Sequence, residues 1–243
     1  MKKILLTIFL FVLALSLVAC GGNNSNDSMD VAGAKKIYED TMKAYGSGKG
    51  VDAKVTYNYG TQTSSIQFAY NLEGNNIKDL AYVVNNELGE LSVYVKDGVA
   101  YMNAYGTKTK TNMTDADNAT FVEKYTFAKA VEEINVLFGY TFFGAAKVDS
   151  ATDSKVKLSC DLSLLQADPS LDEDAFFEAE ENIEKLQAKK ALAVEFEYSG
   201  SNMSKFVGKV TETDDTVKTF TIEFKGTAPT ITLPDVSGYE EVE

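Results

Sequence analysis

The sequence predicts an α+β fold in which a curved antiparallel β-sheet packs on a few helices. Segments of alternating apolar and polar residues follow one another across short turns. Amphipathic helical segments lie before and between them, without the strand–helix–strand rhythm of a parallel sheet. Because a sheet of eight or more strands tends to curl, we expect curvature.

The first 19 residues have the pattern of a secretory signal. A basic start, Met1–Lys3, precedes an apolar run, Ile4–Val18, and a small residue, Ala19, precedes a cysteine. Such a segment is not a fold element. We therefore expect residues 30–243 to form a single domain, which is long enough to bury a core without disulfides or metal.

The stretch Leu17–Cys20 resembles the lipobox of bacterial lipoproteins. The resemblance implies cleavage before Cys20, a diacylglyceryl thioether on its sulfur, and an anchor at the outer, extracytoplasmic face of the cell membrane. Residues 20–29 contain mostly Gly, Asn and Ser and are expected to form a flexible tether. A secreted protein without lipid remains an alternative, as does a disulfide between Cys20 and Cys160. Otherwise Cys160 is a free thiol on the apolar side of its strand.

The composition excludes several classes of function. The chain contains no histidine, no tryptophan and no arginine, since all 23 basic residues are lysines. Loss of Lys2 and Lys3 with the signal leaves 21 lysines against 36 acids, a net charge of −15. Nucleic acid and anionic lipid headgroups would repel such a chain. Histidine-based catalysis and histidine metal sites are impossible.

The first half of the chain predicts one helix followed by an antiparallel meander. A helix is expected from Asp30 to Tyr45, with Asp30 as its N-cap. The pair Asp97-Gly98 is a strong signal for a two-residue hairpin. Strands are expected at residues 51–59, 66–72, 80–84, 91–95, 99–105 and 107–111, the last at a sheet edge.

The second half predicts helices, one strand, a further helix and three closing strands. Thr120 and Glu123 have the spacing of a capping box before a helix that reaches Phe138. We expect a strand at residues 155–164, a helix from Ser170 to Lys190, and strands at residues 192–198, 205–211 and 217–224.

Six apolar side chains are candidates to line a ligand cavity. They share the apolar phase of their strands, and a curled sheet covered by few helices can enclose apolar space. A plain hydrophobic core explains the same pattern equally well. The candidates are Tyr57, Phe68, Tyr70, Leu91, Val93 and Phe196.

An aromatic segment between two glycines is a candidate lid. Tyr140, Phe142 and Phe143 lie between Gly139 and Gly144, which supply hinge freedom. We expect a loop that packs across the mouth of the sheet. The alternative is a helix end that packs permanently into the core.

The residues predict neither an enzyme nor a cofactor. Asp115, Asp117 and Asn118 imitate the start of a calcium loop, but the sixth and twelfth positions hold Thr120 and Thr126 instead of glycine and glutamate. We therefore expect no metal site.

The architecture resembles that of the LolA/LppX-like lipoprotein superfamily, whose anchored members include many from low-GC bacteria. The hairpin Val93–Tyr101, with Tyr94, Asp97-Gly98 and Tyr101, resembles that group's hairpin motif, and Ile231–Pro234 resembles its usual ending. The resemblance covers nearly the whole chain after the signal. It implies a half-barrel of antiparallel strands wrapped on helices, with an apolar cavity that accepts acyl chains.

The function expected from these observations is that of an anchored envelope lipoprotein that binds a lipid or another hydrophobic ligand. LolA itself has a functional arginine on its sheet and no anchor, so the transport of lipoproteins that LolA performs is not implied. The alternative is an anchored protein-interaction module with a solid core and no ligand. Neither the ligand nor a protein partner is identified by the sequence.

Overall fold

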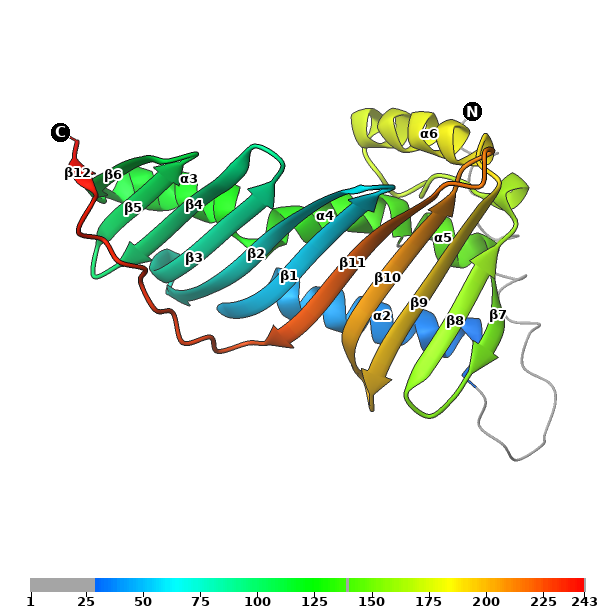
Figure 1. Cartoon of the computed structure of the whole chain (residues 1–243). Coiled ribbons are helices and arrows are strands. Elements are labelled where there is room, and N and C mark those ends of the chain that lie inside the picture. Colours follow the sequence, from blue (N-terminus) through cyan, green and yellow to red (C-terminus); the bar gives the residue numbers. More distant parts are fainter. Residues whose placement is uncertain (1–28, 139, 243) are drawn as a thin grey trace.

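The fold is a long, twisted sheet with most of its helices on one face (Figure 1). The computed structural model describes residues 29–138 and 140–242. The helices are α2 (Val31–Gly46), α3 (Asp115–Tyr125), α4 (Phe127–Phe138), α5 (Tyr140–Ala145), the short 3-10 helix η1 (Leu162–Leu164) and α6 (Glu173–Gln187). The strands are β1 (Gly50–Tyr59), β2 (Gln62–Glu73), β3 (Asn76–Asn86), β4 (Gly89–Lys96), β5 (Val99–Ala104), β6 (Thr107–Asn112), β7 (Ala146–Ala151), β8 (Lys155–Cys160), β9 (Ala191–Ser199), β10 (Asn202–Thr211), β11 (Val217–Gly226) and β12 (Glu240–Glu241).

All twelve of these strands belong to one open sheet. Their order is β12-β6-β5-β4-β3-β2-β1-β11-β10-β9-β8-β7. Every neighbouring pair is antiparallel except β12 and β6, which are parallel. The predicted fold class, a curved antiparallel sheet packed on a few helices, is confirmed. The strand pair β1–β11 joins the first meander to the closing strands at the centre of the sheet.

The N-terminal half of the chain follows the sequence pattern closely. Asp30 caps α2, because its side chain accepts a hydrogen bond from the Gly33 backbone at 2.7 Å. Asp97 and Gly98 both have positive φ, at 50° and 75°, as a two-residue hairpin turn of this type requires.

The central helices begin and break at other residues than predicted. The capping box is formed by Thr114 and Asp117, so the helix starts before Thr120 and the predicted box with Glu123 is wrong. Thr126 has an extended backbone, and it divides the predicted helix into α3 and α4.

Residues 140–145 form α5, so the prediction of an aromatic loop at Tyr140–Phe143 is wrong. The neighbouring strand β7 was not expected, and the predicted strand at residues 155–164 ends at Cys160. Burial of the aromatic side chains between the sheet and the other helices explains why this segment is folded rather than exposed.

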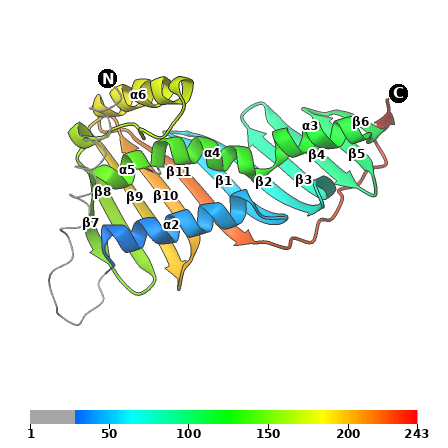
Figure 2. The same cartoon turned by 180° about the vertical axis from the view of Figure 1, so that it is seen from behind.

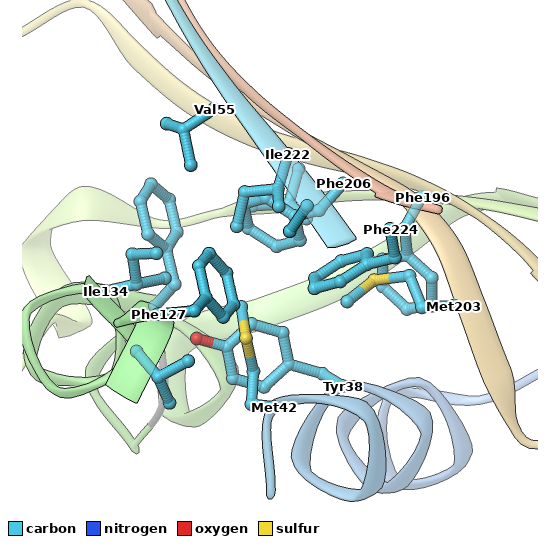
Figure 3. Packing of buried hydrophobic residues seen from close by; sticks show 14 of the residues in the cluster. Tyr38, Met42, Val55, Phe127, Ile134, Phe196, Met203, Phe206, Ile222 and Phe224 are labelled. Carbon is cyan, nitrogen blue, oxygen red and sulfur yellow. The ribbon is translucent and has the colours of Figure 1, made fainter. Parts of the chain in front are cut away.

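Figure 2 shows α2, α4 and α5 lying across one face of the sheet. A cluster of aromatic and aliphatic side chains holds the helices there (Figure 3). Tyr38 of α2 lies with its ring centroid 5.6 Å from Phe206 of β10 and 5.3 Å from Phe143 of α5. Thr41 of α2 accepts a hydrogen bond from the Met203 backbone at 3.0 Å. The apolar stripe of α2 and one polar contact therefore fix this helix against the strands on the β7 side of the sheet.

Candidate functional site

The candidate site is a strip of half-covered apolar side chains on the helix-covered face of β1 to β4. Strand register places Val55, Ile66, Val84 and Leu91 in one row across these four strands. Val55 is buried, whereas Ile66, Val84 and Leu91 are only half-buried. The main contacts of helices with the sheet are those of α2 with β10 and β7, of α5 with β8 and of α3 with β3. We call Tyr57, Tyr59, Ile66, Val84 and Leu91 the open strip.

Two tyrosines form the end of the open strip. The rings of Tyr57 and Tyr59 are stacked, with centroids 6.2 Å apart and planes 5° apart. Tyr57 also lies 5.1 Å from the ring of Phe220 at the margin of the core. The strip therefore runs from the packed core to an exposed aromatic surface at the end of β1.

A surface pocket opens where the strip reaches the turns of the sheet. Its volume is about 230 Å³, and it lies between the β1–β2 and β3–β4 hairpin ends. The Gln62 amide donates to the Glu87 carboxylate at 3.1 Å, and the Leu88 backbone donates to Asn86 Oδ1 at 2.9 Å. These bonds hold the two hairpin ends in place on either side of the opening. The lining residues are Tyr59, Gln62, Thr63, Ser64, Asn86, Glu87 and Leu88.

The six predicted cavity residues all lie on the helix-covered face but at different depths. Tyr57 and Leu91 belong to the open strip, whereas the other four are buried. Phe68 packs with its ring 5.3 Å from Phe127 of α4. Burial raises the pKa of Tyr70 to about 12 against the lowering effect of a hydrogen bond with the Phe127 backbone. Phe68, Tyr70, Val93 and Phe196 therefore act as core side chains in this structure.

The predicted lid residues lie in α5. Phe142 and Phe143 are buried, with ring centroids 5.5 Å apart, and Phe142 also contacts Phe138 at 6.2 Å. The Tyr140 side chain and Gly139 lie outside the part of the chain that is described. This packing matches the alternative of a helix end in the core.

Sequence reasoning missed four residues of this region: Tyr59, Ile66, Val84 and Leu88. The first two continue the alternation of strands that the sequence identified, so the signal for their face was present. A different signal could have identified Leu88. It is a large apolar residue in a turn, where it cannot pack into the core.

Cys160, the cysteine among the described residues, does not belong to the open strip. It lies far along the sheet in β8, and burial raises the pKa of its thiol to about 11. A thiol with that pKa is a poor nucleophile at neutral pH. Among the described residues, no group of three or more Cys, Asp or Glu side chains is placed to hold a metal ion.

The fold and the open strip define an α+β protein with an open antiparallel sheet and a partly uncovered apolar face. Solved structures with similar folds include LprF from Mycobacterium bovis, at 13% identity and a TM-score of 0.39, covering 84% of this chain and 97% of LprF. A LolA superfamily protein from Nitrosomonas europaea is similar at 10% identity and a TM-score of 0.24, covering 83% and 95% of the two chains.

A third similar structure is the MucA/MucB complex of Pseudomonas aeruginosa. The identity is 10% and the TM-score 0.32, and the match covers 81% of this chain and 58% of that one. At these identities and TM-scores the likeness says nothing of what this chain binds. No protein-family model matches the sequence, and a search of curated proteins finds no significant relative.

The helices of the described segments are too short or too polar to cross a bilayer.

Proposed function

We propose that the chain is a membrane-anchored lipoprotein of the cell envelope that binds a lipid or another hydrophobic ligand on the open strip. The observation that carries the proposal is the change in burial along one row of the sheet, from buried Val55 to half-buried Ile66, Val84 and Leu91. Apolar side chains left partly exposed in a row gain free energy when an apolar ligand covers them, at about 25 cal/mol per Å².

The anchor is supported by the sequence alone. Cys20 follows an apolar run and a small residue, and the described domain begins at Met29, nine residues later. Two acyl chains on a cysteine are sufficient for stable anchoring.

Native mass spectrometry of the lipidated protein, extracted from its membrane in mild detergent, tests the ligand. We expect a non-covalent adduct of lipid mass on the wild type. Val84→Asn should reduce the adduct, because it places an amide in the middle of the strip.

Val210→Asn is the matched control for Val84→Asn. Val210 is also a half-buried valine on the helix-covered face, but it lies in β10, outside the strip. Equal loss of the adduct in both variants would contradict a site on the strip.

A wild type without any adduct would favour the second candidate function, an anchored protein-interaction module with a solid core. The specific observation behind that candidate is the dense packing of Phe68, Tyr70, Val93 and Phe196, which leaves them no role beyond the core.

A further inference from the structure

The exposed apolar side chains of the described residues gather at one end of the sheet. Six of the seven large ones lie at the end where β1, β3, β5, β8 and β10 finish: Tyr59, Leu88, Tyr105, Leu164, Phe177 and Val217. The seventh, Val242, lies beside β6 near the C-terminus. This end carries the β1–β2, β3–β4, β5–β6 and β10–β11 turns and lies at the top of Figure 1.

The opposite end of the sheet is polar. Its turns consist of small or polar residues, at Gly74-Asn75, Asp97-Gly98, Thr152–Ser154 and Ser199–Ser201. The two ends of the same strands thus differ in chemistry, although both face solvent. Turn formation alone favours polar residues. Two of the turns at the first end, Gly60-Thr61 and Thr213–Asp215, follow that rule, so it is Leu88 and Tyr105 that call for another explanation.

Three of the exposed side chains lie at the β1–β2, β3–β4 and β5–β6 hairpins, which follow one another along this end of the sheet. Tyr59 is 49% exposed, Leu88 79% and Tyr105 50%. Since neighbouring strands lie about 4.8 Å apart, successive hairpin ends follow at intervals of about 10 Å. The three side chains therefore form a row along the edge, which we call the apolar rim.

The backbone at Tyr105 adds an independent observation. Its φ is +52°, in the left-handed region where Gly and Asn are favoured and a bulky aromatic residue is rare. The turn has a glycine, Gly106, directly after it, yet the strained position carries a tyrosine. Strain of this kind at an exposed aromatic points to a use for the side chain.

The chain outside the described residues indicates what the rim contacts. If Cys20 is lipidated, Met29 follows it nine positions later, a reach of about 30 Å when fully extended. A bilayer surface is then always within reach of the domain. Tyrosine and leucine at the tips of a row of turns suit that surface, because tyrosine favours the headgroup region and leucine the acyl region.

The charges around the rim supply no electrostatic attraction to a bilayer, so a contact there depends on the apolar side chains. Glu87 and Glu90 flank Leu88, and they are exposed. Lys218 at the neighbouring β10–β11 turn is paired with Glu212 at 2.7 Å, and Lys190 is paired with Asp215. No excess of lysines is available there to attract anionic headgroups.

We propose that the apolar rim, Tyr59, Leu88 and Tyr105, rests on the surface of the bilayer that holds the anchor. The proposal depends on the anchor of the proposed function and adds an orientation to it. The open strip begins at Tyr59, so this orientation places the strip next to the bilayer, where a hydrophobic ligand can pass between the two without crossing water.

Fluorescence quenching in vesicles tests the orientation. The lipidated protein, with Cys160→Ser to remove the free thiol, is reconstituted in phosphatidylcholine vesicles that contain nitroxide-labelled phosphatidylcholine. An environment-sensitive dye is attached at Thr61→Cys or at Asn75→Cys. Both are exposed turn residues, at opposite ends of β2, so they form a matched pair that leaves the rim intact.

We expect quenching and a blue shift of the dye at position 61 and neither at position 75. Leu88→Ser combined with Tyr105→Asn should remove the quenching at position 61, and asparagine suits the backbone of residue 105. Val242→Ser, which changes an exposed apolar residue away from the rim, should leave the quenching unchanged.

Two results would overturn the docking while leaving the anchor intact: vesicle-bound protein without quenching at position 61, or equal quenching at both positions. A contact with a protein partner instead of the bilayer would give the first result. Protein that does not float with the vesicles at all would overturn the anchor of the proposed function, and the docking with it.

Discussion

Gly208 lies directly beneath the ring of Phe138, where β10 passes under the end of α4. A Cβ atom at this position would lie 2.8 Å from Cζ of Phe138, closer than two carbon atoms can approach without movement. The absence of a side chain at residue 208 therefore allows α4 to pack on the sheet.

We predict that Gly208→Ala destabilises the fold by about 1–3 kcal/mol, the usual cost of overpacking a core. Phe138→Leu shortens the opposing side chain and should relieve much of that cost. Urea unfolding of the two single variants and the double variant measures the coupling. If the changes in unfolding free energy of the two single variants simply add up in the double variant, residues 208 and 138 are not in energetic contact.

Two residues on the same face of one strand, two positions apart, provide a second prediction. Val93 is buried and Leu91 is only half-buried on the same face of β4. Val93→Glu should cost several kcal/mol, because it buries a charge without a partner, whereas Leu91→Glu can turn its carboxylate to water and should cost far less. Chemical denaturation measures the loss of stability in both variants. Similar midpoints for the two would contradict the deeper burial of Val93.

At the residue scale the sequence predicted faces but not depths. Period-two alternation places Tyr57, Phe68, Leu91 and Phe196 on one face, and the register confirms this. How deeply each is buried depends on where helices from other parts of the chain lie. That is a tertiary property, so alternation could not separate the open strip from the core.

Individual elements were predictable where their signals were local. The Asp30 cap and the Asp97-Gly98 turn each depend on a few adjacent residues. The predicted capping box was wrong because two threonines have the required spacing. Thr120 has an acid three residues later, and so does Thr114, which forms the box with Asp117. Both satisfy the spacing, and only the earlier one starts the helix.

Hydrogen exchange distinguishes a fixed α5 from a moving lid. Because Phe142 and Phe143 are buried among aromatic rings, we predict that α5 amides are protected as strongly as those of the β4–β5 hairpin, without added ligand. Faster exchange in α5, slowed by a fatty acid, would restore the lid that the sequence suggested.

The helix α6 makes a useful comparison in the same experiment. It packs mainly on α4 and η1 through one face, while Phe177 remains exposed. We expect its amides to exchange faster than those of α5 and of the hairpin, because fewer elements hold it. Equal protection of all three would show that α6 belongs to the same cooperative unit.

At the scale of the whole molecule, the proposed anchoring depends on one residue. We predict that Cys20→Ala abolishes incorporation of a fatty-acid analogue and leaves the protein uncleaved or released from the membrane, because the acyl chains are the feature expected to hold it there. Metabolic labelling followed by fractionation measures both effects. Equal labelling of the variant would disprove lipidation at Cys20.

The molecule as a whole was predicted as a class but not as a topology. The meander could be derived from its turns, because each of its strands pairs with a neighbour in sequence. The position of β7 at one edge and the parallel contact of β12 with β6 at the other could not, because no local pattern specifies a partner far along the chain. The same holds for the pairing of β1 with β11.

That central pairing also affects how the chain can fold during its synthesis. Asn58 and Thr219 are hydrogen-bonded neighbours although they lie 161 positions apart in the sequence. The early meander therefore emerges with β1 as an unpaired edge, and its partner is among the last strands to appear. Long-range pairing of this kind gives a high contact order and slow folding, and an open strand edge invites aggregation meanwhile. The centre of the sheet therefore cannot form until β11 has been synthesised.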